Sequence, residues 1–440
     1  MKKMILPVFA LLTLLTLTNF SSPTLKAVEA ILMGLLIIRY LQFDFISLKK
    51  IVELNRLLVF YLLLLFIAAL RSNDPNVELT SAIFISLFLL LFFILFSCLA
   101  ISYIYNTAVD SQKFIVNFII VPYVLFFIVN FILFYLNINP SVKVLEEGDT
   151  GSAVLLSYFG FHVQRVMFPF SSGLNEYSTF CAGIFALSIW FFLVGRKYKF
   201  LILISIFTSA LSLLLVDSRA ALLYPIVIVA GMYMVYVLNL NGIHKNLKYL
   251  ALVVVLGPLM YLYLLPALAG NSVINSALSR GSSDLATGDS RFTIWKIALN
   301  EFMDFKPEHI VGYGEVGQFG SRVSLKWAYL FSRWKDAEMK SPHSTVFSLI
   351  FDEGYLGLIT YVAIVFQSLK RASVLWGSKP VTAGAIIVFM LYNIIGGISE
   401  SLGGITLLNF TYLFLMIVIT INTEYGYINK RQLIFIIHES

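Results

Sequence analysis

Apolar residues occur along this chain in long uninterrupted runs that are separated by short polar segments. A helix that crosses a bilayer needs roughly 20 mostly apolar residues, and runs of about this length recur throughout the sequence. The predicted spans cover residues 4–20, 27–43, 54–70, 79–105, 114–136, 174–194, 200–216, 221–240, 247–266, 346–369, 381–398 and 402–422. The pattern predicts an all-α polytopic membrane protein with about twelve transmembrane helices.

The composition agrees with this interpretation. Hydrophobic residues make up 59% of the 440 and charged residues only 12%, and the mean hydropathy of +0.88 lies outside the usual range of soluble proteins. The first apolar run follows Lys2 and Lys3 and therefore looks like a signal peptide. No small-residue cleavage site follows it, so we interpret this run as a retained helix.

The positions of Lys and Arg predict the topology. Short cytoplasmic loops retain cations during insertion, and most of the 31 Lys and Arg lie in or beside the short loops that are inner when both termini are cytoplasmic. We therefore expect both termini in the cytoplasm and the protein in a bacterial inner membrane. Because the cations are spread over these loops, the net charge of +7 reflects topology, and no nucleic-acid partner is expected. Cys98 and Cys181 lie inside predicted spans, so no disulfide is expected.

Two segments on the outer, periplasmic side are too long to be simple turns. One is 137–173, between spans five and six, and the other is 267–345, between spans nine and ten. We divide the chain into residues 1–266 with nine spans, the large and partly helical periplasmic loop 267–345, and residues 346–440 with three spans and a short cytoplasmic tail. Function is expected in the outer loops.

The large loop contains a helical pattern at 288–302. Asp289 or Ser290 can cap a helix there, and the residues Ile294, Trp295, Ala298, Leu299 and Phe302 share one face. We predict an amphipathic helix at the membrane surface with Trp295 at headgroup depth. Packing is a more ordinary role for Trp295 than stacking on a sugar.

The stretch SPHSTVFSLIFDEGYLG at 341–357 is the most informative. Ser341 and Pro342 resemble a helix cap followed by a first-turn proline, which places His343 in the first turn. At 100° per residue His343 shares a face with Gly354 and Gly357, where another helix could approach closely. The positive end of the helix dipole favours a neutral imidazole, which suits a general base. A histidine bonded to a loop carbonyl is the alternative.

Two arginines are candidates for anion binding. Arg219 lies in a very short outer turn between spans seven and eight, and Arg291 lies at the start of the loop helix. Both can instead contact lipid headgroups or pair with a nearby acid such as Asp217. The segment VGYGEVGQFG at 311–320 contains a GxG with no βαβ pattern around it, so we interpret Gly312 and Gly314 as turn residues that allow close approach.

Taken together, these segments resemble the family of O-antigen ligases and polymerases. The family's histidine motif is a His, then Asn, Ser or Gln, then nine residues and GxxG. His343, Ser344, Gly354 and Gly357 resemble this motif. Its Arg-x3-Leu pattern resembles Arg219 and Leu223. GLNEYS at 173–178 resembles its xPN segment with Leu174 in place of proline, GDSRFTIW resembles its GRxxxW segment, and VGYGEVGQF its GxGxxxF segment. The resemblance covers roughly 160–365, and the first five spans match only in hydropathy.

The resemblance implies a GT-C-type membrane glycosyltransferase whose donor is a glycan on undecaprenyl diphosphate. It implies a catalytic role for His343 and diphosphate-binding roles for Arg219 and Arg291, with Arg165 as a further candidate. Trp295, Leu223, Ser344 and the four glycines would be motif or structural residues. An arginine fork suits a departing diphosphate, and a histidine can activate the acceptor hydroxyl for a single inverting displacement.

We therefore expect an O-antigen polymerase that joins lipid-linked repeat units at the periplasmic face. The alternative is an O-antigen ligase that transfers the glycan to lipid A core. Expected partners are the undecaprenyl-diphosphate-linked oligosaccharide and membrane lipids, with a chain-length-regulating protein as a candidate. A polysaccharide-lipid transporter or flippase is a more distant alternative, and Asp352 and Glu353 inside the tenth span keep it open.

No cofactor is expected, and no metal. The large loop carries the carboxylates Asp289, Glu301, Asp304, Glu308, Glu315, Asp336 and Glu338. Their spacing matches no recognisable ligand pattern, and His162, His309 and His343 are scattered along the chain.

Overall fold

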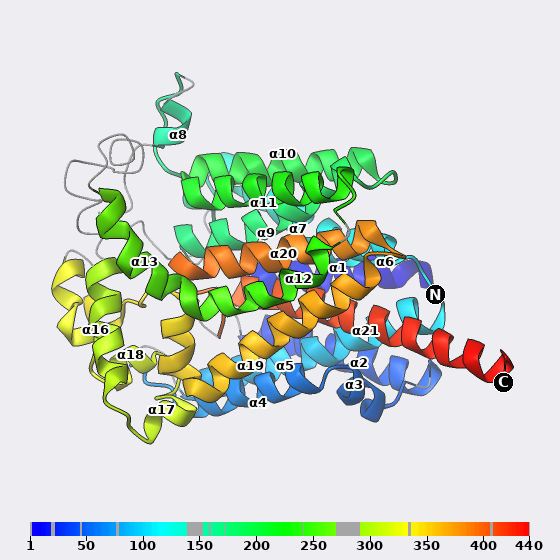
Figure 1. Cartoon of the computed structure of the whole chain (residues 1–440), viewed down its shortest axis with the longest axis horizontal. Coiled ribbons are helices and arrows are strands. Elements are labelled where there is room, and N and C mark those ends of the chain that lie inside the picture. Colours follow the sequence, from blue (N-terminus) through cyan, green and yellow to red (C-terminus); the bar gives the residue numbers. More distant parts are fainter. Residues whose placement is uncertain are drawn as a thin grey trace.

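A computed structural model gives the fold of this chain (Figure 1). The structure describes residues 2–18, 23–44, 46–75, 79–138, 153–157, 160–171, 173–240, 242–269, 291–332, 336–404 and 408–439. The predicted helix cap at Asp289 or Ser290 lies outside these ranges.

Every extended run of secondary structure in these ranges is helical. The first half of the chain forms α1 (Lys2–Thr18), α2 (Pro23–Phe43), α3 (Leu48–Leu54), α4 (Arg56–Leu70), α5 (Leu79–Ala100), η1 (Ile101–Asn106), α6 (Ser111–Ile115), η2 (Val116–Ile120), α7 (Val121–Tyr135), α8 (Val154–Ser157), α9 (Leu174–Leu193) and α10 (Lys199–Val216). The second half forms α11 (Arg219–Val237), α12 (Ile243–Asn246), η4 (Leu247–Leu252), α13 (Val253–Ala269), α16 (Arg291–Met303), α17 (Glu308–Val311), α18 (Gly317–Gly320), η5 (Ser324–Lys326), η6 (Ala328–Phe331), η7 (Ala337–Met339), α19 (Thr345–Leu375), α20 (Pro380–Ser399) and α21 (Leu408–Glu439).

The structure confirms an all-α membrane protein with several spans. Eight helices in the described ranges are long and apolar enough to cross a membrane, or nine if α3 and α4, which meet at 96°, form one span. Helices α1, α2 and α21 cover most of the other three predicted segments, but α1 is shorter, α2 carries Lys26, Glu29 and Arg39, and α21 begins only at Leu408. The count of twelve and the sidedness of the membrane therefore stay predictions.

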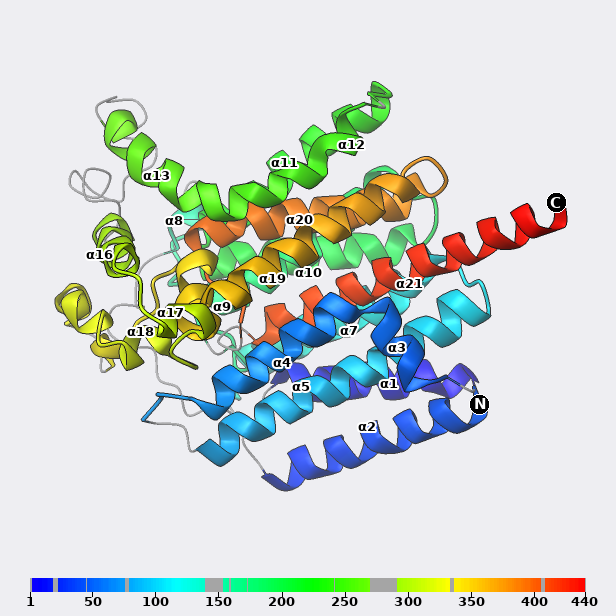
Figure 2. The same cartoon turned by 60° about the horizontal axis from the view of Figure 1, so that its bottom comes forward.

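The long helices lie side by side in one bundle with two distinct ends. Figures 1 and 2 show both termini at one end and α16, α17 and α18 at the opposite end. We call these the terminal end and the loop end. The residues predicted to carry chemistry lie on elements that meet at the loop end.

Two antiparallel helices, α9 and α20, form the centre of the bundle. They are 78% and 83% buried inside the protein over their most apolar windows, whereas the Ile243–Leu264 segment is only 22% buried. The indole Nε1 of Trp190 donates to the carbonyl of Val381 (2.8 Å), and the hydroxyl of Tyr392 donates to the carbonyl of Thr179 (2.9 Å). Gly384 is needed here because a Cβ would lie 2.0 Å from the Trp190 ring. These contacts fix the register of the pair.

Helix α19 is not continuous, which corrects the predicted helical face. Gly354 has φ 72° and ψ −168°, so the chain kinks there and the 100° spacing does not carry from His343 through to Gly357. A Cβ on Gly354 would lie 2.4 Å from the backbone nitrogen of Gly312. Gly354 therefore admits the backbone around Gly312, not another membrane span. A Cβ on Gly357 would lie 2.3 Å from Cβ of Glu353, the residue just before the kink.

The last predicted span begins later than the apolar run suggests. Residues 400–404 are non-helical, and α21 begins at Leu408. Ser401 and Leu402 are nonetheless buried. Non-helical backbone at this depth is tolerated only where protein surrounds its polar groups. The hydrogen bonds of residues 400–404 join this segment to the start of α19, where the candidate site lies.

Candidate active site at the loop end

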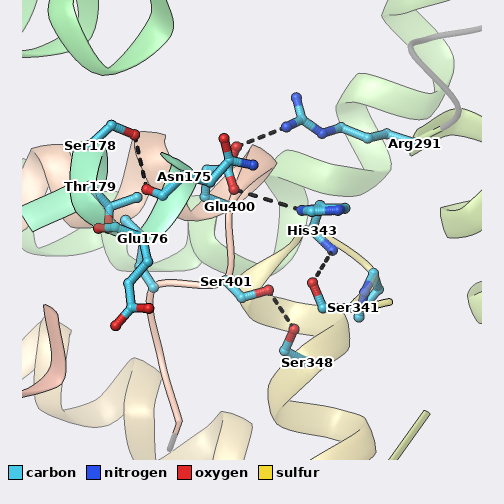
Figure 3. Close-up of polar contacts among 12 residues, drawn as sticks. Asn175, Glu176, Ser178, Thr179, Arg291, Ser341, His343, Ser348, Glu400 and Ser401 are labelled. Carbon is cyan, nitrogen blue, oxygen red and sulfur yellow. Dashed lines mark hydrogen bonds and ion pairs between the residues drawn. The ribbon is translucent and has the colours of Figure 1, made fainter. Parts of the chain in front are cut away.

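The carboxylate of Glu400 joins the two most promising residues of the sequence motifs (Figure 3). Arg291 donates from Nη2 to Oε1 of Glu400 at 2.8 Å, and Nδ1 of His343 lies 3.8 Å from Oε2. The three side chains are 21–27% exposed, so the cluster is shielded but reachable. A cation, an imidazole and a carboxylate therefore meet where α16, α19 and α20 converge.

The charges around Glu400 determine its protonation. Burial raises the pKa of this carboxyl. Arg291 and His343 together lower it by more than burial raises it, so the pKa lies below the ordinary value. Glu400 is therefore ionised at neutral pH. An ionised carboxylate can accept a hydrogen bond from Nδ1–H of His343. In that tautomer, Nε2 keeps a free lone pair.

His343 lies just outside the helix, which corrects the predicted helix start. Helix α19 begins at Thr345 with Ser344 as the N-cap, and His343 has φ 49°. A non-glycine residue in this left-handed region needs support from its surroundings. Two indoles supply it, because Trp295 Nε1 donates to the carbonyl of Pro342 (2.7 Å) and Trp327 Nε1 to that of Lys340 (3.2 Å).

Thr345 ties the segment after α20 to the start of α19. Its hydroxyl donates to the carbonyl of Glu400 (2.9 Å) and accepts from the backbone nitrogen of Leu402 (2.8 Å). Ser348 and Ser401 share a further hydrogen bond of 2.7 Å, also visible in Figure 3. These bonds hold Glu400 against His343.

Trp295 is fully buried, and this corrects its predicted place among lipid headgroups. Ile294, Trp295 and Ala298 pack against Trp327 and the α19 residues Phe347 and Phe351. The apolar face of α16 thus covers protein instead of lipid. Its burial orients Arg291, one turn earlier on the same helix.

The start of α9 reaches the same end of the bundle. Thr179 on α9 contacts Tyr392 on α20. Asn175 lies one helical turn before Thr179, which places it level with the last turn of α20. Asn175 belongs to the segment that resembles the family's xPN pattern, and Figure 3 shows it on the side of Glu400 away from the Ser348–Ser401 pair. This amide is a candidate ligand for a polar substrate.

Arg219 and Arg165 lie together at the turn between α10 and α11. Arg165 donates from Nε to the carbonyl of Val216 (3.1 Å), and Arg219 is the first residue of α11. Asp217 accepts from the backbone nitrogen of Leu155 (2.9 Å). Within the described ranges, Nε of Arg219 is buried without a hydrogen-bond partner. Leu223, one turn further, is 55% exposed on the bundle surface.

The GxG segment forms a tight turn between two parts of the bundle. Gly312 and Gly314 have φ 77° and 96°. A Cβ on Gly312 would lie 2.3 Å from the carbonyl oxygen of Asp352, and one on Gly314 would lie 2.0 Å from that of Arg71. Side chains would therefore separate the turn from both α19 and the end of α4.

No group of three or more His, Cys, Asp or Glu that could hold a metal ion occurs in the described ranges. Glu301 pairs with Lys306 and Lys326, and His309 is buried. Metal independence of the activity stays a prediction.

Glu400 is the residue that sequence reasoning missed. It lies in GISESLGG at 397–404, in the short connection between two predicted spans. A single acidic residue at the outer edge of a predicted span was the available signal. Its partners are 109 and 57 residues away, and no spacing rule reaches so far.

The fold and the site define a multi-pass α-helical membrane protein. At one end of its bundle, a histidine and an arginine meet a shared carboxylate. Residues 204–362 match the family model described as O-antigen ligase. The chain thus carries an O-antigen ligase family segment, and the resemblance expected from the motifs is confirmed there. The match includes Arg219, Arg291, His343 and both α19 glycines but ends before Glu400. No curated protein matches the sequence.

Proposed function

We propose that this protein transfers a glycan from undecaprenyl diphosphate to an acceptor hydroxyl. The observation that carries the proposal is the convergence of His343 and Arg291 on Glu400 in a chain whose residues 204–362 match the O-antigen ligase family model. A glycosyl diphosphate already carries a good leaving group. The enzyme therefore needs a base for the acceptor and cations for the departing diphosphate.

His343 is the proposed base. With its Nδ1–H directed at the Glu400 carboxylate, Nε2 takes the proton of the acceptor hydroxyl while the acceptor oxygen attacks the anomeric carbon. The bond from that carbon to the diphosphate oxygen breaks, and the configuration inverts. Glu400 acts through His343 as a positioning residue, and its charge stabilises the imidazolium that forms.

Arg291, Arg219 and Arg165 are the proposed cations. Arg291 uses Nη2 for Glu400, and its planar guanidinium has further N–H groups for phosphate oxygens. Arg219 adds a positive charge at the first turn of α11, where backbone N–H groups also favour an anion. The polyprenyl chain would remain in lipid between helices.

The proposed site faces the periplasm of a bacterial inner membrane, with the termini in the cytoplasm. The distribution of Lys and Arg supports this orientation, since the terminal end of the bundle carries the basic short loops.

We favour a polymerase, whose acceptor is another lipid-linked repeat unit. The ligase alternative is supported by the description of the matching family, and its acceptor is lipid A core. Both activities use the same donor and the same proposed residues. They differ only in which hydroxyl reaches His343.

Reconstitution of the purified protein in nanodiscs tests the proposal. A polymerase supplied with undecaprenyl-diphosphate-linked repeat units alone releases undecaprenyl diphosphate and makes longer glycans. A ligase makes a conjugate only when lipid A core is added. Absence of undecaprenyl diphosphate release in both reactions would overturn the proposed function.

A further inference from the structure

The segment 400–404 descends from the active site into the bundle along α19. Its upper part bonds to Thr345 and Ser348, as described above. At its lower end, the backbone nitrogen of Gly404 donates to the hydroxyl of Tyr61 on α4 (3.0 Å), and its carbonyl accepts from Thr411 (2.8 Å). The polar backbone of this segment is thus well bonded at both ends.

Glu353 lies beside the lower end of this segment and is an exception to that pattern. It is only 2% exposed, and both of its carboxyl oxygens are buried without a hydrogen-bond partner in the described part of the chain. A Cβ placed on Gly404 would lie 3.3 Å from Oε1 of Glu353. The carboxyl therefore points at the backbone of Gly404, four residues after Glu400.

The groups that face Glu353 are acidic or neutral. Asp352 on α19 and Glu315 in the GxG turn are the charged residues that act on it. Tyr61 on α4 faces it as well, and Tyr361 on α19 bonds to Asn393 (2.8 Å). Asp352 itself is engaged, because its Oδ1 accepts from the backbone nitrogen of Gly317 (2.8 Å).

A buried carboxylate without a bonded cation or donor is costly, and two neighbouring acids add repulsion. Within a membrane such a group is expected to neutralise itself unless something binds it. A proton is the smallest ligand that does so. It needs no other ligating side chain, and the described residues contain no cluster that could hold a metal ion.

We propose that Glu353 is a proton-binding site inside the bundle and that it is the neutral acid at neutral pH. The bound proton lets the carboxyl pack against Gly404 without charge. Loss of the proton would place a negative charge beside Asp352 and segment 400–404. That charge would loosen the segment whose other end carries Glu400, so proton occupancy is coupled to the active site. This inference does not depend on which glycan, if any, is transferred.

Infrared difference spectroscopy of the full-length protein in nanodiscs tests the site. The matched pair is Glu353→Gln and Glu53→Gln, because Glu53 is an exposed carboxylate on α3. At neutral pH we expect Glu353→Gln to remove protonated-carboxyl absorbance and Glu53→Gln to remove carboxylate absorbance. Loss of carboxylate absorbance in both variants would overturn the proposal. Adding sodium to the parent could also shift a carboxylate band that Glu353→Gln lacks. Such a shift would mean that Glu353 is ionised, and it would overturn the proposal as well.

A measurement on the parent protein covers the case in which Glu353→Gln does not insert. A hydrophobic carbodiimide dissolves in the bilayer and adds to protonated carboxyl groups, and mass spectrometry locates the adduct. We expect the adduct on Glu353 at neutral pH, with less of it as the pH rises, and none on Glu53. An unmodified Glu353 would overturn the proposal.

Discussion

Glu400 and Arg291 form an ion pair of 2.8 Å that joins the residue after α20 to the first residue of α16. Nδ1 of His343 lies 3.8 Å from the other oxygen of the same carboxylate. Glu400 therefore links α16 to the start of α19. The proposed base and one proposed cation thus share a single anion. The position of each depends on Glu400.

Replacing Glu400 with Gln should lower glycan transfer by at least about tenfold, since a neutral amide cannot hold both Arg291 and a protonated His343. Release of undecaprenyl diphosphate in nanodiscs measures the effect. Glu338→Gln, on the short helix η7 of the same loop, is the control and should be close to the parent. Equal activity of Glu400→Gln and the parent would remove Glu400 from the mechanism.

The same variant gives a prediction for stability against pH. The pKa of Glu400 is lowered in the folded protein, so its stabilising contribution is present above the unfolded carboxyl pKa of about 4.3 and is lost as the pH falls through the lower folded value. The parent should therefore melt at a higher temperature than Glu400→Gln at neutral pH. This difference should shrink once the pH falls below about 4.3. A difference that is constant with pH would mean that the charge is not responsible.

His343→Ala should abolish transfer while expression and membrane insertion stay normal, because His343 precedes the helix and its side chain is partly exposed. His162→Ala is the control, since His162 is an exposed histidine. The rate of transfer and the amount of inserted protein are measured together. Near-normal transfer by His343→Ala would show that another group is the base.

Arg219→Lys and Arg291→Lys should each reduce transfer far more than a conservative exchange normally does. Lysine keeps the charge but cannot bind two phosphate oxygens with a planar fork. Arg322→Lys, an exposed arginine near α18, should leave the rate unchanged. If both lysine variants were fully active, these arginines would serve topology or headgroup contacts instead.

The sequence predicted His343 and Arg291 as candidate residues, but it did not predict the contacts that hold them. His343 and Arg291 were identified from a spaced motif, but the Ser-Pro pair suggested a helix start two to three residues too early. His343 adopts a left-handed conformation that Trp295 and Trp327 stabilise from far along the chain. Capping rules describe only local sequence, so they could not include that support.

The glycines show a second limit of reasoning from periodicity. A helical wheel assumes an unbroken helix, and Gly354 breaks it with φ 72°. The predicted span at 402–422 shows a related limit, because its residues 402–404 are non-helical. Hydropathy reports how apolar a segment is. It does not report whether the buried backbone is helical.

Gly354→Ala should destabilise the protein by about 2 kcal/mol or more, because the residue is left-handed and a Cβ would meet the backbone of Ile310 and Gly312 at 2.4–2.5 Å. Gly231→Ala is the control, since nothing lies within 4 Å of its Cβ position in α11. Thermal melting in detergent compares the two variants. A Gly354→Ala protein as stable as Gly231→Ala would contradict the kink.

The last prediction concerns metal. A carboxylate base working with a divalent cation is the alternative to an arginine-only site, and Glu400 adds a carboxylate to those of the large loop. Its oxygens already face Arg291 and His343, so a cation at that position would have to displace both. We therefore expect purified protein to transfer glycan from undecaprenyl diphosphate in excess EDTA at close to its normal rate. The assay compares EDTA alone with EDTA followed by excess magnesium or manganese. Activity that is lost on chelation and restored by either ion would move the search for the base from His343 to Glu400 and the loop carboxylates.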